Sequence, residues 1–275
     1  MVNILVPTDF SPLSKIAVHY SVKIANKLNG NVTLLHVIDL ERQVKATLRM
    51  QTDVRNYVRR TRNALEAIEQ EIATEVMIRK PVKFKISKGQ NFSEAVLREA
   101  RRLRSGLIVM GTRGATGIKR TIIGSNTASM IGISHIPVLA VPEGAEFKSF
   151  RNVVYATDLK NVEAELDVLI PYVQRFNSTI HVIHIVGKGG NVGEIEDRID
   201  NIVKKTGYKN IVTLVTVDPD INGAIEQYIG VSKADLLAMF THAPSFYEKL
   251  LDKSVTRNMA FHSPIPLLAF KQNGH

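Results

Sequence analysis

The chain has 275 residues, 44% of them hydrophobic, and its mean hydropathy is -0.01. These values suit a soluble globular protein that folds as one large domain or as two domains of ordinary size. Cysteine is absent, which excludes disulfides, thiolate metal sites and cysteine nucleophiles.

The formal net charge is +10 and the isoelectric point is near 9.7, so the surface attracts anions such as nucleotides, nucleic acid or acidic lipid headgroups. Part of this charge lies in two arginine clusters: Arg55, Arg59, Arg60 and Arg62; Arg98, Arg101, Arg102 and Arg104. Both clusters fall in segments with a helical pattern, for which a solvated helix face is the default interpretation. Because tryptophan is absent and few aromatic residues interleave with the arginines, a stacking platform for single-stranded nucleic acid is not expected.

No apolar run approaches the roughly 20 residues that a helix needs to cross a bilayer. The first seven residues lack the basic region of a signal peptide and have the pattern of a strand. We therefore expect a cytoplasmic protein with no membrane partner.

The first half of the chain predicts strands that alternate with helices. Short apolar runs predict strands at 2–6, 32–38, 82–86, 107–110 and 138–141, and apolar residues at helical spacing predict helices at 12–28, 41–79, 91–103 and 125–133. Ser11 and Pro12 suit the start of the first helix, and Asn91 with Glu94 resembles a capping box. The stripe over 41–79 drifts in phase, which predicts one bent helix or two. The alternation predicts an α/β fold with a parallel, doubly wound sheet.

The second half repeats the order of the first after a loop at 142–149. Residues 153–158 correspond to 4–9, 180–185 to the strand that contains His36, 236–239 to 107–110, and 265–270 to 136–141. The last two correspondences share one offset, because 111 maps to 240 and 136 maps to 265. This internal duplication predicts two domains, at residues 1–145 and 150–275.

The stretch 107–141 contains the candidate ligand site. Gly111 directly follows a strand and Gly114 lies on the next arch, where a residue without Cβ can take positive φ and let the backbone approach an anion. Gly124 precedes a helix, whose first N–H groups and dipole attract negative charge. The hydroxyls of Ser125 and Thr127 add donors for phosphate oxygens.

Asp9 follows the first strand. The carboxyl ends of the first and fourth strands should lie side by side at the switch point of such a sheet, which would bring Asp9 opposite the glycine arch. There its carboxylate could accept a hydrogen bond from a ribose hydroxyl or position a metal ion. The alternative is that Asp9 only caps the helix that begins near Ser11.

The spacing Gly111-x-x-Gly114, nine residues, Gly124-Ser125 resembles the ATP-binding motif of the universal stress proteins. The stretches 6–11 and 34–39 are similar to the same family, and the resemblance covers residues 1–142 well and 151–271 more faintly. It implies two tandem open parallel five-stranded sheets with helices on both faces, of the flavodoxin-like, adenine-nucleotide-hydrolase-like kind. It also implies a stress-response regulator that binds ATP, AMP or ADP, with or without Mg²⁺, in its first domain. The residues that it assigns to the nucleotide are Pro7, Asp9, Val37, Met110, Gly111, Gly114, Gly124, Ser125 and Asn126. We add Thr8, Arg113 and Thr127 to the candidate site.

The second half departs from this motif. The positions of Gly111, Gly114, Gly124 and Pro7 hold, in that order, Phe240, Ala243, Lys253 and Ala156. A phenylalanine would fill the space that a phosphate-approaching backbone requires, so ATP is not expected to bind here in the same way. This half is instead expected to be a pseudo-dimer partner or to hold a different ligand. Family members commonly dimerise through their last strands, which implies pairing of 138–141 with 267–270 within one chain, or a homodimer.

The residues also leave alternatives to a nucleotide-binding regulator. No Ser/His/Asp set is arranged for nucleophilic catalysis, the histidines do not cluster as metal ligands, and no catalytic or metal-ligating residue is assigned. A slow ATPase or autophosphorylating protein is a second hypothesis, with Asp9 as the one candidate base in the motif. An adaptor for nucleic acid or a membrane surface, driven by the net charge, is the least favoured. The sequence does not name a protein partner.

Overall fold

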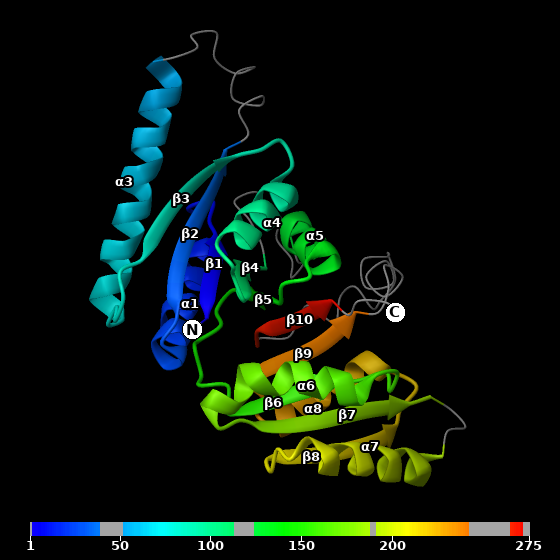
Figure 1. Cartoon of the computed structure of the whole chain (residues 1–275). Coiled ribbons are helices and arrows are strands. Elements are labelled where there is room, and N and C mark those ends of the chain that lie inside the picture. The colour runs from blue at the N-terminus through cyan, green and yellow to red at the C-terminus, as the bar shows by residue number, and fades with distance from the viewer. Residues whose placement is uncertain (1, 39–51, 113–123, 188–190, 242–264, 272–275) are drawn as a thin grey trace. The chain divides into compact units, whose positions relative to one another are not determined.

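The computed structural model describes residues 2–38, 52–112, 124–187, 191–241 and 265–271 (Figure 1). The chain divides into two compact units, Met1–Glu143 and Gly144–His275. In each unit parallel strands alternate with helices, which confirms the predicted α/β class. Within these ranges, no helix combines the length and the apolar character needed to cross a membrane.

The first unit contains an open sheet with the strand order β3-β2-β1-β4-β5. Its strands are β1 (Asn3–Pro7), β2 (Asn31–Ile38), β3 (Lys83–Lys88), β4 (Leu107–Gly111) and β5 (Val138–Val141). All four neighbouring pairs are parallel. The chain runs outward from β1 to β3 and then returns to the other side of β1, so the switch point lies between β1 and β4.

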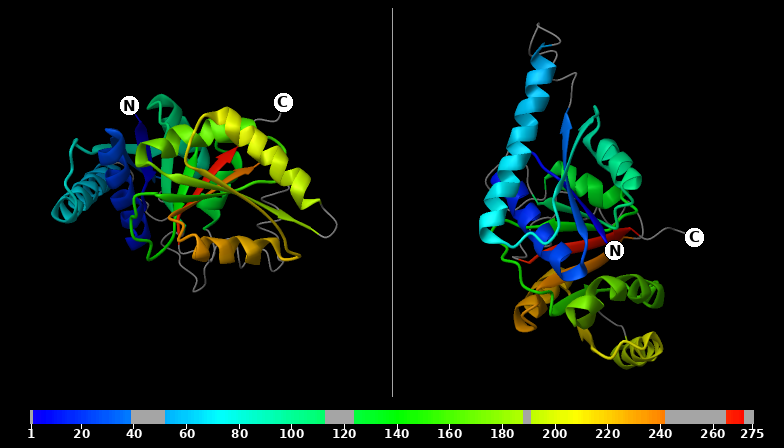
Figure 2. Two further views of the ribbon diagram at one scale, coloured as in Figure 1. Left: turned by 90° about the horizontal axis from the view of Figure 1, so that it is seen from below. Right: turned by 60° about the vertical axis from the view of Figure 1, so that its left-hand side comes forward.

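Two helices cover each face of this sheet (Figures 1 and 2). Helices α1 (Pro12–Leu28) and α3 (Thr52–Glu75) lie on one face, and α4 (Phe92–Arg102) and α5 (Ser125–Ile133) lie on the other. The expected caps are present, because the side chains of Ser11 and Asn91 accept the N–H groups of Ser14 and Glu94. Of the helix predicted at 41–79, the part from 52 to 75 is α3, whereas residues 39–51 lie outside the described residues.

The second unit has the strand order β10-β9-β6-β7-β8, again with parallel neighbours. Its strands are β6 (Asn152–Ala156), β7 (Thr179–Val186), β8 (Ile211–Val217), β9 (Leu236–Thr241) and β10 (Leu267–Lys271). Helix α6 (Val162–Val173), which a 3-10 turn (Gln174–Phe176) extends, and α7 (Val192–Thr206) lie on one face. Helix α8 (Ile221–Val231) lies on the other (Figure 2).

The two units share local contacts at matching positions. In the first, Nδ1 of His36 lies 2.8 Å from the carbonyl oxygen of Thr8, and in the second, Nδ1 of His184 lies 2.8 Å from that of Thr157. The strand register agrees as well, since Gly111 pairs with a residue of β5 and Phe240 pairs with the corresponding residue of β10. The same hydrogen bond therefore fixes the turn after the first strand of each unit.

His181 of β7 is a titratable group in the interior of the second unit. Its Nδ1 lies 2.9 Å from the hydroxyl of Tyr228 on α8, and its Nε2 is buried without a hydrogen-bond partner among the described residues. Burial lowers the pKa of His181, because the half-buried ring is removed from the water that would stabilise its charged form.

This burial predicts a dependence of stability on pH. Between the lowered pKa of the folded state and the ordinary value near 6.5, the unfolded chain binds more protons, so the free energy of unfolding falls as the pH drops below about 6.5. We expect His181→Gln to make the free energy of unfolding less dependent on pH between about pH 7 and pH 5, by an amount that corresponds to the uptake of a fraction of one proton. Urea unfolding at several pH values measures this dependence. The exposed His135 provides the control, because His135→Gln should leave the slope unchanged. Equal slopes for wild type and His181→Gln would contradict the prediction.

Candidate functional site

A cavity of about 110 Å³ lies where β1 and β4 end, at the switch point of the first unit. Its lining comes from the end of β1, the turn and first residues of α1, the end of β4, and the starts of α4 and α5. The lining residues are Pro7, Thr8, Asp9, Ser14, Phe92, Met110, Gly111, Gly124, Ser125, Asn126 and Thr127. The structure thus brings most of the residues that the resemblance assigned to a nucleotide to one place.

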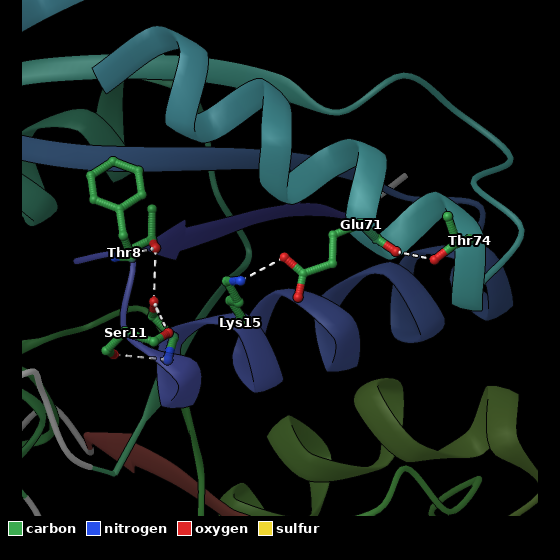
Figure 3. A network of polar contacts seen from close by, with 7 residues as sticks. Thr8, Ser11, Lys15, Glu71 and Thr74 are labelled. Atoms are coloured by element: carbon green, nitrogen blue, oxygen red, sulfur yellow. Dashed lines mark hydrogen bonds and ion pairs between the residues drawn. The ribbon is translucent and has the colours of Figure 1, made fainter. Parts of the chain in front are cut away.

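The turn between β1 and α1 is held by its own hydroxyl groups (Figure 3). Thr8 is buried, and its Oγ1 accepts the N–H of Phe10 at 3.1 Å and lies 2.9 Å from Oγ of Ser14. Oγ of Ser14 in turn donates to the carbonyl of Ser11 at 2.9 Å. These bonds fix Phe10 at a φ of 68°, a conformation that side chains rarely adopt. One wall of the cavity is therefore preformed.

Asp9 lies in this turn and is exposed at the cavity. Its Oδ1 accepts the N–H of Ser11 at 3.1 Å. The structural role considered for Asp9 is thus present, while its position in the lining also leaves it available to a ligand. The two interpretations are compatible, because a carboxylate can accept several hydrogen bonds.

Gly111 ends β4 in a conformation that differs from the expectation. It is not among the described glycines with positive φ, and a Cβ built on it would lie 3.0 Å from the carbonyl oxygen of Leu13 in α1. Glycine is required here because the backbone of α1 passes close to β4. This contact is a reason for glycine that the sequence did not indicate, while approach to an anion at the cavity stays a prediction.

The start of α5 forms the opposite wall. Gly124 precedes the helix and has no side chain that could accept a hydrogen bond, so the backbone N–H groups of the first turn have no side-chain cap. Ser125 and Asn126 are exposed, whereas Thr127 is buried and its hydroxyl donates to the carbonyl of Gly111 at 2.8 Å. Thr127 thus ties α5 to β4 and does not offer its hydrogen to a phosphate, which corrects the role expected for it.

Three of the assigned residues are not in the lining as described. Val37 is half-buried in β2 and does not line the cavity, and Arg113 and Gly114 lie outside the described residues. Two lining residues were missed from the sequence, Ser14 and Phe92. Both stand within a turn of recognised helix starts at the same edge of the sheet, which is the signal that could have identified them.

Helix α3 is linked to this turn from the outer side. Nε2 of His36 lies 3.2 Å from the hydroxyl of Tyr57 on α3, and the ring of Phe10 lies 4.6 Å from the His36 ring. Further along, Nζ of Lys15 lies 2.5 Å from a carboxylate oxygen of Glu71 (Figure 3). Two contacts therefore join α3 to the segment that lines the cavity.

Comparison with known proteins identifies the family. Residues 1–142, more than half of the chain, match the sequence model of the universal stress protein family. The chain belongs to the universal stress protein family. A universal stress protein of Methanocaldococcus jannaschii is 25% identical over 148 residues, which cover 50% of this chain and 81% of that protein.

Two solved structures are similar over nearly the full length. A universal stress protein from Archaeoglobus fulgidus has a TM-score of 0.72 at 18% identity, covering 98% of this chain and 96% of that one. A functionally unknown protein from Pseudomonas aeruginosa has a TM-score of 0.60 at 15% identity, covering 98% of this chain and 92% of that one. At these identities the likeness shows a shared fold, here extending over both units of this family member.

The second unit has aromatic rings at the position that corresponds to the end of β4. Phe240 is 8% exposed, stacks on Phe270 with ring centroids 4.6 Å apart, and meets the edge of the Tyr155 ring at 5.7 Å. The hydroxyl of Tyr155 donates to the carboxylate of Glu165, and burial, followed by the charge of Glu165, raises the pKa of Tyr155. The positions of Ala243 and Lys253 lie outside the described residues.

Proposed function

We propose that the first unit binds an adenine nucleotide in the cavity between β1 and β4, and that the chain acts as a nucleotide-dependent regulator of the stress response. The observation that supports this most is that an uncapped helix start and a preformed polar turn line one cavity. Free N–H groups at a helix start are a suitable site for phosphate, because the helix dipole favours negative charge there. Membership of the universal stress protein family agrees with this function.

The lining suggests how the parts of the nucleotide would be distributed. Pro7 and Met110 offer apolar surface to the base and sugar, and the Asp9 carboxylate is available to a ribose hydroxyl. Gly124, Ser125 and Asn126 would receive the phosphates. No lysine or arginine is among the described lining residues, so the backbone N–H groups of Ser125 and Asn126 and the hydroxyl of Ser125 would carry the phosphate contacts, while the N–H of Gly124 donates to the carbonyl of Thr112.

The test is a calorimetric titration of the full chain with ATP. We expect one ATP to bind per chain, because the position of Gly111 holds Phe240 in the second unit and this ring packs on Phe270. Parallel titrations with ADP and AMP measure the contribution of the outer phosphates that the α5 start would hold. A stoichiometry of two, or no heat of binding at all, would contradict the proposal.

For the second unit we propose a structural role beside the first. The buried rings of Phe240, Phe270 and Tyr155 support it, since they pack together at the end of β9, where the first unit has Gly111. Pairing of the last strands of the two units, which the family resemblance implies, stays a proposal.

Hydrolysis of ATP is the alternative, and Asp9 is the group to examine. It is the one carboxylate among the described lining residues, and it would also be the candidate to hold a cation bound with the nucleotide. Its hydrogen bond with the N–H of Ser11 favours a positioning role. Analysis of the titrated samples for ADP addresses this alternative, and turnover that Asp9→Asn leaves unchanged would exclude Asp9 as a catalytic group.

A further inference from the structure

Helix α3 carries a row of arginines on its outer face. Thr61, Leu65, Ile68 and Ile72 of this helix are buried. Arg55, Arg59 and Arg62 are exposed and follow one another at helical spacings of four and three residues, so they share one face. Arg59 lies two residues before the buried Thr61, which places this row on the side away from the sheet. The row is about 10 Å long, at 1.5 Å per residue.

These arginines have no acidic partners. Among the residues whose side chains are described, no ion pair involves Arg55, Arg59, Arg60 or Arg62, and Arg59 donates to the amide oxygen of Asn56 at 3.4 Å. Elsewhere on α3, Glu71 pairs with Lys15 of α1 and Glu69 accepts the N–H of Val82, while the exposed Glu66 follows Arg62 by four residues. The acidic half of the helix holds it to the domain, and the basic half faces solvent.

This arrangement opposes the stability of the helix itself. Arginines three and four residues apart repel one another, and basic residues are unfavourable in the N-terminal half, where the helix dipole favours acids. Helix α4 shows the usual arrangement, with Glu94 in its first turn and Arg101 and Arg102 in its last. The charges of α4 therefore have a local explanation, whereas Arg55 and Arg59 of α3 have no acidic residue three or four positions further along the helix. Charges placed against helix stability indicate a partner that makes use of them.

We propose that the outer face of α3 binds the phosphate backbone of double-stranded DNA. Guanidinium groups bind phosphate through paired hydrogen bonds, and a row of three neutralises successive phosphates. Figures 1 and 2 show the N-terminal half of α3 extending past the ends of β2 and β3. A helix of about 10–12 Å diameter fits the major groove, which is about 12 Å wide. The net charge of +10 assists approach to a polyanion.

The structure favours a duplex over other anionic partners. A membrane-surface helix inserts an apolar face, but the apolar residues of α3 are buried against its own domain. Single strands bind through aromatic stacking, and the arginine row contains no aromatic residue. Contacts limited to phosphates predict binding with little sequence preference. This inference is independent of the nucleotide site.

The test compares two triple variants of the full chain that remove equal charge. Arg55→Gln/Arg59→Gln/Arg62→Gln changes α3, and Arg101→Gln/Arg102→Gln/Arg104→Gln changes the exposed arginines at the end of α4. Binding to a labelled DNA duplex is measured by fluorescence anisotropy at salt concentrations from about 50 to 200 mM. For wild type, the three phosphate contacts of the row predict a slope of log K against log salt of about −2.7, and the α3 variant should lose most of it.

The control variant should retain the wild-type slope. Glutamine is a good helix former and removes the repulsion, so the α3 variant should melt at the same or a higher temperature while it loses DNA binding. Equal losses in both variants would show a general charge effect and overturn the proposal. Tighter binding of wild type to phosphatidylserine vesicles or to polyglutamate than to the duplex would overturn it as well.

Discussion

Phe240→Ala is expected to lower the free energy of unfolding of the second unit by about 3–5 kcal/mol. The ring is buried, lies flat on Phe270 with 9° between the ring planes, and meets the edge of Tyr155. Removing the ring loses the free energy that its burial away from water contributes. It also leaves a cavity that two rigid aromatic neighbours cannot easily close. Urea unfolding followed by circular dichroism measures the change.

Phe240→Leu separates the effect of the ring from that of apolar volume. Leucine keeps most of the buried surface, so its cost should be smaller, at about 1–1.5 kcal/mol. Both variants should still bind one ATP per chain, because neither of them introduces glycine at position 240, 243 or 253, where the first unit has Gly111, Gly114 and Gly124. A second ATP on the Phe240→Ala variant would show that the ring only covers a functional site, contrary to the structural role proposed here.

Gly124→Lys is expected to abolish the stabilisation of the protein by ATP. At a hundredfold excess over the dissociation constant, a bound ligand adds about 2.7 kcal/mol to the free energy of unfolding, which appears as a rise in melting temperature. Gly124 lines the cavity, and its φ of −59° and ψ of 148° are accessible to lysine. The variant should therefore fold, while its side chain obstructs the start of α5 where the phosphates are proposed to lie.

Gly132→Lys supplies the matched control on the same helix. A Cβ built at Gly132 meets no atom within 4 Å, so the substitution adds the same charge at the other end of α5 without a steric conflict. It should retain the full ATP-dependent rise in melting temperature. An unchanged rise in Gly124→Lys, or its loss in both variants, would remove the α5 start from the proposed site.

The fold could be read from the sequence because its signals are local. Ser11 with Pro12 and Asn91 with Glu94 begin their helices where the capping pattern predicts, and the helix expected at 125–133 is α5 without change. Each of these signals depends on backbone N–H groups within one turn. The strands were equally clear, because a strand buried on both faces is a continuous apolar run.

The site was only partly predictable, since its details depend on contacts between distant segments. The glycine pattern identified position 111, but the passage of Leu13 close by, which also favours glycine there, is reported by no spacing in the sequence. The hydrogen bond from the hydroxyl of Thr127 to the carbonyl of Gly111 could not be predicted either, because β4 and α5 meet only in the folded chain. Phe92 belongs to a third segment that reaches the cavity across the sheet.

The ring of His36 has a further consequence for the first unit. A carbonyl can only accept, so the contact with Thr8 assigns the hydrogen to Nδ1 and leaves Nε2 to accept the hydroxyl hydrogen of Tyr57. A single imidazole in one tautomer thereby couples the cavity wall to α3. A movement of this turn would therefore act first on the ring of His36 and, through it, on Tyr57 of α3.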